Sequence, residues 1–183
     1  SGLGWIYLFE ANTLPGQPNK SKRDSLRNLS EINFDLAYSE GLDENNSWSN
    51  ILSGKAFLLN FKSDSLLAEY YNNIFIDNTL WDMMIENAND AISLTDQLLA
   101  LNSNYNFYPY IPLDDFEYDL CINKNKIRIL RSQLYFKLEN YSNVYDELSL
   151  LTDSFVCPDG TPSNMQEAIY CISYVSNLLS DCN

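Results

Sequence analysis

The chain contains no histidine among its 183 residues. Histidine is the side chain that most often acts as a general base near neutral pH, and it is the commonest nitrogen ligand of protein-bound metals. Its absence excludes Ser–His–Asp and Cys–His catalysis within this chain, and also zinc sites that use histidine. We therefore expect a protein that is not an enzyme.

The sequence also lacks the short motifs that hold most metal ions and phosphate cofactors. No two of its four cysteines form a C-x-x-C pair, and its six glycines are scattered along the chain, so no phosphate-binding loop is formed. The acidic stretches "DENNSW" and "DDFEYD" have no central glycine of the kind found in calcium loops. We predict no metal site and no cofactor.

Positive charge is scarce, with 11 basic residues against 25 acidic ones and a net charge of −14. Such a surface repels the phosphates of nucleic acids, so no nucleic-acid partner is expected. No stretch approaches the ~20 apolar residues of a membrane helix, so we predict no transmembrane segment. The acidity favours a basic partner.

Apolar residues recur at three- and four-residue steps along most of the chain, which predicts helices. One stripe is Leu26, Leu29, Ile32 and Leu36, and the stripe of the last helix is Met165, Ile169, Ile172, Val175 and Leu179. Residues 62–64 are taken as a break between two antiparallel helices, and Ser163 with Gln166 as a capping box. The predicted helices cover residues 22–39, 48–61, 65–76, 79–101, about 127–138, about 144–151 and about 165–179.

These seven helices predict an all-α fold. We expect a single domain over residues 1–183, built from antiparallel helical hairpins that form a bundle or a short solenoid. Residues 1–20 are expected to be an extended or docking segment. It contains at most one short strand, near Trp5 to Phe9, followed by a turn rich in proline and glycine.

One of the predicted hairpins resembles a tetratricopeptide repeat. Ser132 stands at the small position of the first helix, Tyr135 at the aromatic position, and "KLENY" (137–141) at the turn. The second helix would carry Val144, Leu148 and Leu151, and Arg128 replaces the tryptophan of the family pattern. A second copy begins with Gly54 and Phe57 and continues at Leu66 and Tyr70. The resemblance covers about fifty residues and implies peptide or protein binding.

The stretch "YNFYPYIPLDDFEYDL" (105–120) is the candidate binding site. Six aromatic rings and four carboxylates in sixteen residues could stack on sugar rings or grip a peptide. Equally, the stretch could be a crossover loop that buries alternate rings in the core. The arrangement of helix pairs around an aromatic loop is similar to the helical scaffold of SusD-like glycan-binding proteins, which implies a glycan ligand. The candidate binding residues are Tyr105, Phe107, Tyr108, Tyr110, Asp114, Asp115, Glu117 and Tyr118.

Cysteine usage bears on the compartment. If Cys157, Cys171 and Cys182 include a disulfide, the chain belongs outside the cell or on its surface, and otherwise in the cytoplasm. The function that we expect is a non-enzymatic helical module that binds a peptide or protein. The alternatives are glycan binding through the aromatic loop and a structural role in a larger assembly.

Overall fold

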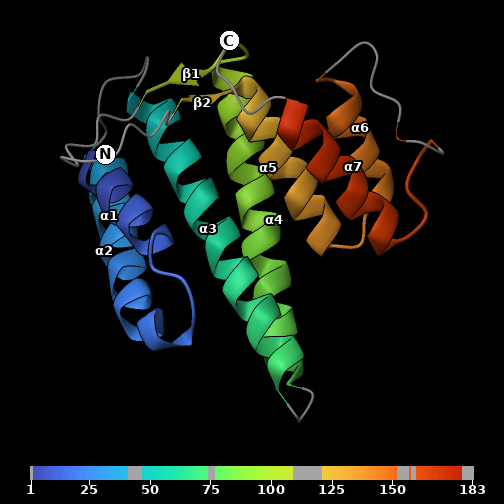
Figure 1. The fold of residues 1–183 in the computed structure, drawn as a ribbon. Helices are drawn as coiled ribbons and strands as arrows, with labels where there is room; N and C mark the ends of the chain where they lie inside the picture. The colour runs from blue at the N-terminus through green and yellow to red at the C-terminus, as the bar shows by residue number, and fades with distance from the viewer. Residues whose placement is uncertain are drawn as a thin grey trace.

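The computed structural model describes residues 2–40, 47–73, 77–108, 121–151, 157 and 160–178. Within these ranges the chain forms seven α-helices and a tiny antiparallel sheet, which confirms the all-α class (Figure 1). The elements are α1 Gly2–Asn12, the 3₁₀ turn η1 Gln17–Asn19, α2 Lys20–Ser39, α3 Ser47–Asn72, α4 Asn78–Leu101, β1 Asn106–Phe107, β2 Ile122–Asn123, α5 Lys124–Lys137, α6 Tyr141–Ser149 and α7 Met165–Leu178.

The two longest helices, α3 and α4, pack against each other at the centre of the molecule. The pair α1–α2 lies on one side of them and the group α5–α7 on the other (Figure 1). α4 follows the predicted helix over 79–101 closely, and Asp77 caps its start, because the Asp77 carboxylate accepts a hydrogen bond from the Thr79 amide at 3.0 Å. Its buried face carries Met84, Ala88, Ala91, Thr95 and Leu98.

The predicted break at residues 62–64 is wrong, because α3 runs through it as one helix of 26 residues. No glycine or proline lies between residues 55 and 72. Ser63 is buried, and its hydroxyl donates to the Leu59 carbonyl at 2.9 Å, an arrangement that leaves the helix intact. The second tetratricopeptide-like copy therefore forms no hairpin, since both of its halves lie on α3.

The N-terminal segment is also helical, where an extended segment was expected. Gly4 of α1 and Gly54 of α3 face the same ring, that of Phe34 on α2. A Cβ at Gly4 would lie 2.8 Å from Phe34 Cδ1, and one at Gly54 would overlap the ring. Ser30 of α2 donates to the Gly4 carbonyl at 2.8 Å. These contacts dock α1 onto α2 and α3.

Two of the predicted stripes differ from the buried faces. On α2, Leu26, Phe34 and Ala37 are buried, while Leu29, Ile32 and Leu36 are 41%, 53% and 56% exposed. On α7, Met165 and Ile169 are exposed, and the buried face is formed by Ala168, Cys171, Ile172 and Val175. In both helices a small residue lies at the contact, where it permits close packing.

The hairpin over "KLENY" is present. α5 ends at Lys137 and α6 begins at Tyr141, and Asn140 caps α6 by accepting a hydrogen bond from the Asn143 amide at 3.2 Å. Glu139 takes a left-handed conformation with φ 56° in the turn. Val144, Leu148 and Ser132 are buried, as this hairpin requires.

Candidate functional site

The described part of the predicted binding loop points into the core. Tyr105 is 2% exposed, and its hydroxyl donates to Asn50 Oδ1 at 3.1 Å and lies 2.6 Å from Ser53 Oγ. Phe107 is partly buried, with its ring centroid 5.7 Å from that of Trp5. Tyr108 is 60% exposed. The remaining candidates, Tyr110, Asp114, Asp115, Glu117 and Tyr118, lie outside the described residues.

Tyr105 is an anchor between distant parts of the chain. Its carbonyl accepts a hydrogen bond from the Lys124 amide at 2.8 Å, next to the pairing of β1 with β2. Burial raises the pKa of the Tyr105 hydroxyl, although the hydrogen bond with Ser53 opposes this effect. The hydroxyl is therefore neutral and fixed, which suits a structural role.

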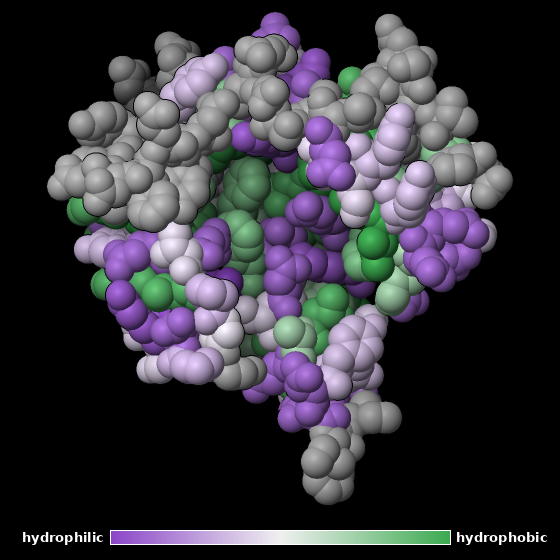
Figure 2. Space-filling view, viewed as in Figure 1, coloured by the Kyte–Doolittle hydropathy of each residue, from purple (hydrophilic) through white to green (hydrophobic). Residues whose placement is uncertain are grey.

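A cleft lined by aromatic rings lies between α1, α3 and the start of α5. We call it the aromatic cleft. Figure 2 shows the molecule from the same side as Figure 1, and a hollow with hydrophobic residues on its floor lies near the middle of that view. The cleft has a cavity volume of about 130 Å³. Its walls are Trp5, Leu8, Phe9, Phe57, Phe61, Cys121, Ile122 and Lys126.

The rings of the aromatic cleft support one another. Trp5 and Phe9 are stacked at 5.5 Å between centroids, and Phe57 lies 6.1 Å from Trp5 and 6.3 Å from Phe61. Trp5 is 1% exposed and donates its Nε1–H to the Asn50 carbonyl at 3.2 Å. Because Asn50 also accepts the hydrogen bond of Tyr105, the predicted loop and the cleft share one anchor.

The chemistry of the cleft is that of a socket for one apolar side chain. An apolar cavity of about 150 Å³ is large enough to bind benzene, and this cleft is of similar size. Lys126 is the single charged residue among its described walls. This site was not predicted from the sequence, although a signal was present. Trp5 with Phe9, and Phe57 with Phe61, are aromatic pairs at i, i+4 spacing and so share a helix face.

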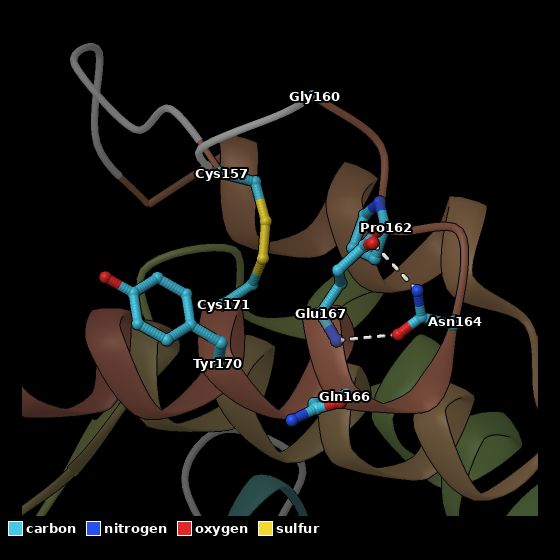
Figure 3. Close-up of a pocket in the computed structure, with 8 residues that line it drawn as sticks. All are labelled: Cys157, Gly160, Pro162, Asn164, Gln166, Glu167, Tyr170 and Cys171. Atoms are coloured by element: carbon cyan, nitrogen blue, oxygen red, sulfur yellow. Dashed lines mark hydrogen bonds between the residues drawn. A yellow bond between two sulfur atoms is a disulfide. The ribbon is translucent and has the colours of Figure 1, made fainter.

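A second cavity, of about 340 Å³, lies beside a disulfide between Cys157 and Cys171 (Figure 3). This bond joins two of the last three cysteines, a pairing that the sequence analysis left open, and Cys121 is disulfide-bonded as well. The bond ties α7 to the chain that precedes it. Tyr170 and Gln166 of α7 also line this cavity.

The polar groups at the rim of this second cavity are used to begin α7. Asn164 is the capping residue, since its Oδ1 accepts from the Glu167 amide at 3.0 Å. The Glu167 carboxylate in turn accepts from Asn164 Nδ2 at 2.7 Å (Figure 3). It also accepts from the Ser163 amide at 2.9 Å. The capping box is thus one residue later than the predicted pair of Ser163 and Gln166. The hydrogen bonds from Ser163 and Asn164 hold the pKa of Glu167 below its usual value.

The described residues contain no group of three or more histidine, cysteine or acidic residues placed to hold a metal ion. Among the helices that the structure describes, none combines the length and apolarity needed to cross a membrane. Comparisons with protein-family models, curated proteins and solved structures found no match to this chain.

Proposed function

We propose that this chain is a non-enzymatic helical module that binds a peptide or protein partner through the aromatic cleft. The observation that carries the proposal is the position of the part-exposed rings. Phe9, Phe57 and Phe61 are half-buried around a cavity between helices, whereas the described end of the predicted loop has its rings in the core, apart from Tyr108. A groove between helices is the place where a helical module presents apolar contacts to a peptide.

The size of the cleft indicates how the partner is held. A cavity of about 130 Å³ accepts one leucine, methionine or phenylalanine side chain as an anchor. Burial of such a side chain contributes roughly 1.5–3 kcal/mol. The net charge of −14 favours basic residues on either side of the anchor and speeds association with a basic partner.

Selection from a displayed peptide library tests this proposal. We expect the selected peptides to share one large apolar residue flanked by lysine or arginine. Binding can be measured from the fluorescence of Trp5, in a chain that carries Trp48→Phe and Trp81→Phe so that Trp5 is its remaining tryptophan. Phe61→Ala should weaken the selected peptides about tenfold or more, because a buried anchor loses part of its socket.

The matched control is Tyr71→Ala, which removes an aromatic ring that is 61% exposed and is not among the cleft walls. Peptide affinity should not change in this variant. Selection that yields no apolar consensus, or affinities that are equal in Phe61→Ala and in the unchanged chain, would contradict the proposal.

Glycan binding stays the alternative, and it has one supporting observation. Tyr108 is 60% exposed beside the segment that contains the other candidate residues of the loop. Tyr108→Ala should abolish the binding of a glycan and leave the selected peptides unaffected. The disulfide between Cys157 and Cys171 leads us to place either function in an oxidising compartment, outside the cell or on its surface.

A further inference from the structure

We propose a second binding site, for a phosphate or sulfate group, in the cleft where Arg23 and Arg27 of α2 face α3. We call it the arginine cleft. It consists of two adjoining cavities of about 260 and 360 Å³. The two cavities share Lys20, Arg27, Ser65 and Glu69, so Arg27 stands between them.

Arg27 is the central observation. It is 7% exposed, and its Nη1 donates to the neutral Ser65 hydroxyl at 2.6 Å. Among the described residues no carboxylate lies within ion-pair distance of Arg27, and its buried Nε has no hydrogen-bond partner. A buried arginine is ordinarily paired, since an unpaired buried charge is costly. The guanidinium therefore has unused hydrogen-bond donors, and its charge is only partly offset, by the more distant carboxylates of Asp24 and Asp64.

Arg23 lies one helical turn earlier on α2 and, like Arg27, has no carboxylate partner among the described residues. Its Nη1 donates to the carbonyls of Leu14 and Gly16 at 2.9 and 3.2 Å, and its Nε is buried without a partner. It lines the same cavity as Arg27, and the structure gives it no ion pair with any described carboxylate. In a chain with 25 acidic residues, two adjacent arginines without a carboxylate partner are unexpected.

The other charges around the arginine cleft are already paired. Lys20 contacts Glu69 at 2.7 Å and Asp64 contacts Lys137 at 2.7 Å. On the wall of the second cavity, Lys62 contacts Glu31 at 2.7 Å, and Asp24 offsets part of the arginine charge. The surplus positive charge therefore belongs to Arg23 and Arg27.

These donors suit a tetrahedral oxyanion. Guanidinium groups bind phosphate and sulfate through two parallel hydrogen bonds, and the remaining positive charge of the cleft attracts an anion. The side chain of Arg27 is held in place by Ser65 and by the Phe61 ring, whose centroid is 6.0 Å from its central carbon. The group could belong to a free ion, a small molecule or a modified side chain of a partner, because all three present the same oxygens.

The test uses inorganic phosphate, added to the full chain at constant ionic strength, with acetate in a parallel titration. Thermal unfolding should shift to higher temperature with phosphate, because a ligand of the folded state stabilises it. The Nε–H signals of Arg23 and Arg27 in a ¹⁵N correlation spectrum should move in the same titration. Arg23→Gln should weaken phosphate binding about tenfold or more, as expected when a charged hydrogen bond is lost.

Lys22→Gln is the matched control, since it removes the same charge next to Arg23 from a residue that lies outside both cavities and pairs with Glu10. This variant should retain phosphate binding. Arg23 is only partly buried, so its variant should fold even if Arg27→Gln does not. Phosphate binding that falls equally in Arg23→Gln and Lys22→Gln, acetate bound as tightly as phosphate, or no shift at all would overturn the proposal. None of these outcomes bears on the aromatic cleft, which is tested with other variants.

Discussion

Phe34 shows how single residues decide the packing of the N-terminal half. Its ring is fully buried between a glycine of α1 and a glycine of α3, and there is no space for a Cβ at either position. Glycine is unfavourable in a helix interior, by roughly 0.5–1 kcal/mol relative to alanine. At Gly54 this intrinsic cost is offset by the contact that the ring makes with the bare backbone.

We expect Gly54→Ala to destabilise the protein by about 1–3 kcal/mol, because the new methyl group would overlap a ring in a well-packed core. Chemical denaturation followed by circular dichroism would measure the change in the free energy of unfolding. Gly2→Ala is the control, since nothing lies within 4 Å of a Cβ at that position. Equal stability of the two variants would show that the ring can move aside.

At the scale of elements, the pair α5–α6 is held together by ions as well as by apolar contacts. Glu147 of α6 accepts from Arg131 at 2.6 Å and from Arg128 at 2.9 Å, and all three side chains are largely buried. Arg131 also reaches α4, where it contacts Asp96 at 2.5 Å and Thr95 at 2.9 Å. Burial is the largest single effect on Arg131 and opposes its charge, but the contacts with Glu147 and Asp96 together outweigh it, so the pKa of Arg131 is raised.

Glu147→Ala should lower the free energy of unfolding by about 3 kcal/mol, because it leaves two buried guanidinium groups without their shared partner. Urea denaturation would measure the loss. Asp35→Asn is the matched control, since it removes an ion pair to Lys55 at 2.5 Å in which the carboxylate is 55% exposed. Such a surface pair contributes about 0–1 kcal/mol to the free energy of unfolding. A loss in Glu147→Ala no larger than in the control would show that the buried network contributes little.

For the whole molecule, the disulfide sets the stability of the C-terminal helix. The bond between Cys157 and Cys171 closes a loop with a sequence separation of 14, and a loop of this size contributes about 3 kcal/mol in the chain-entropy description. The double variant Cys157→Ala/Cys171→Ala should have a free energy of unfolding that is lower by about 3 kcal/mol. Urea denaturation of this variant would measure the loss.

Peptide mapping of the chain from its native source, without reductant, should recover the segments around Cys157 and Cys171 as one linked species. If both cysteines were recovered as free thiols, the bond and the oxidising compartment would both be contradicted. Mapping after reduction is the control, and it should release the two segments separately.

The elements could be predicted from sequence where periodicity was strong and where a cap or a breaker marked the end. α4 and the α5–α6 hairpin are of this kind, because their apolar stripes and their capping asparagine or aspartate act within a few residues of each other. α3 was divided wrongly because a short polar stretch resembles a turn. Only packing against α4 shows that the helix continues.

For the candidate sites, too, the sequence predicts local features but not the contacts between distant residues. The aromatic loop could be found from sequence, but the burial of Tyr105 could not, because its partners Asn50 and Ser53 are more than fifty residues away. The aromatic cleft combines residues of α1, α3 and α5, and no local pattern predicts which helix faces will meet. The unused hydrogen-bond donors of Arg23 and Arg27 could not be predicted from the sequence, since the lack of a carboxylate partner is a property of the folded surface.

The sequence by itself therefore determined the composition-level properties of this protein. It excludes histidine-based catalysis, predicts an acidic all-α chain and predicts most helices, because composition and short-range periodicity act along the chain. Tertiary structure alone decided which apolar faces are buried, which aromatic rings border a cavity, which charges are paired and which cysteines join. All of these depend on contacts between residues that are distant in sequence.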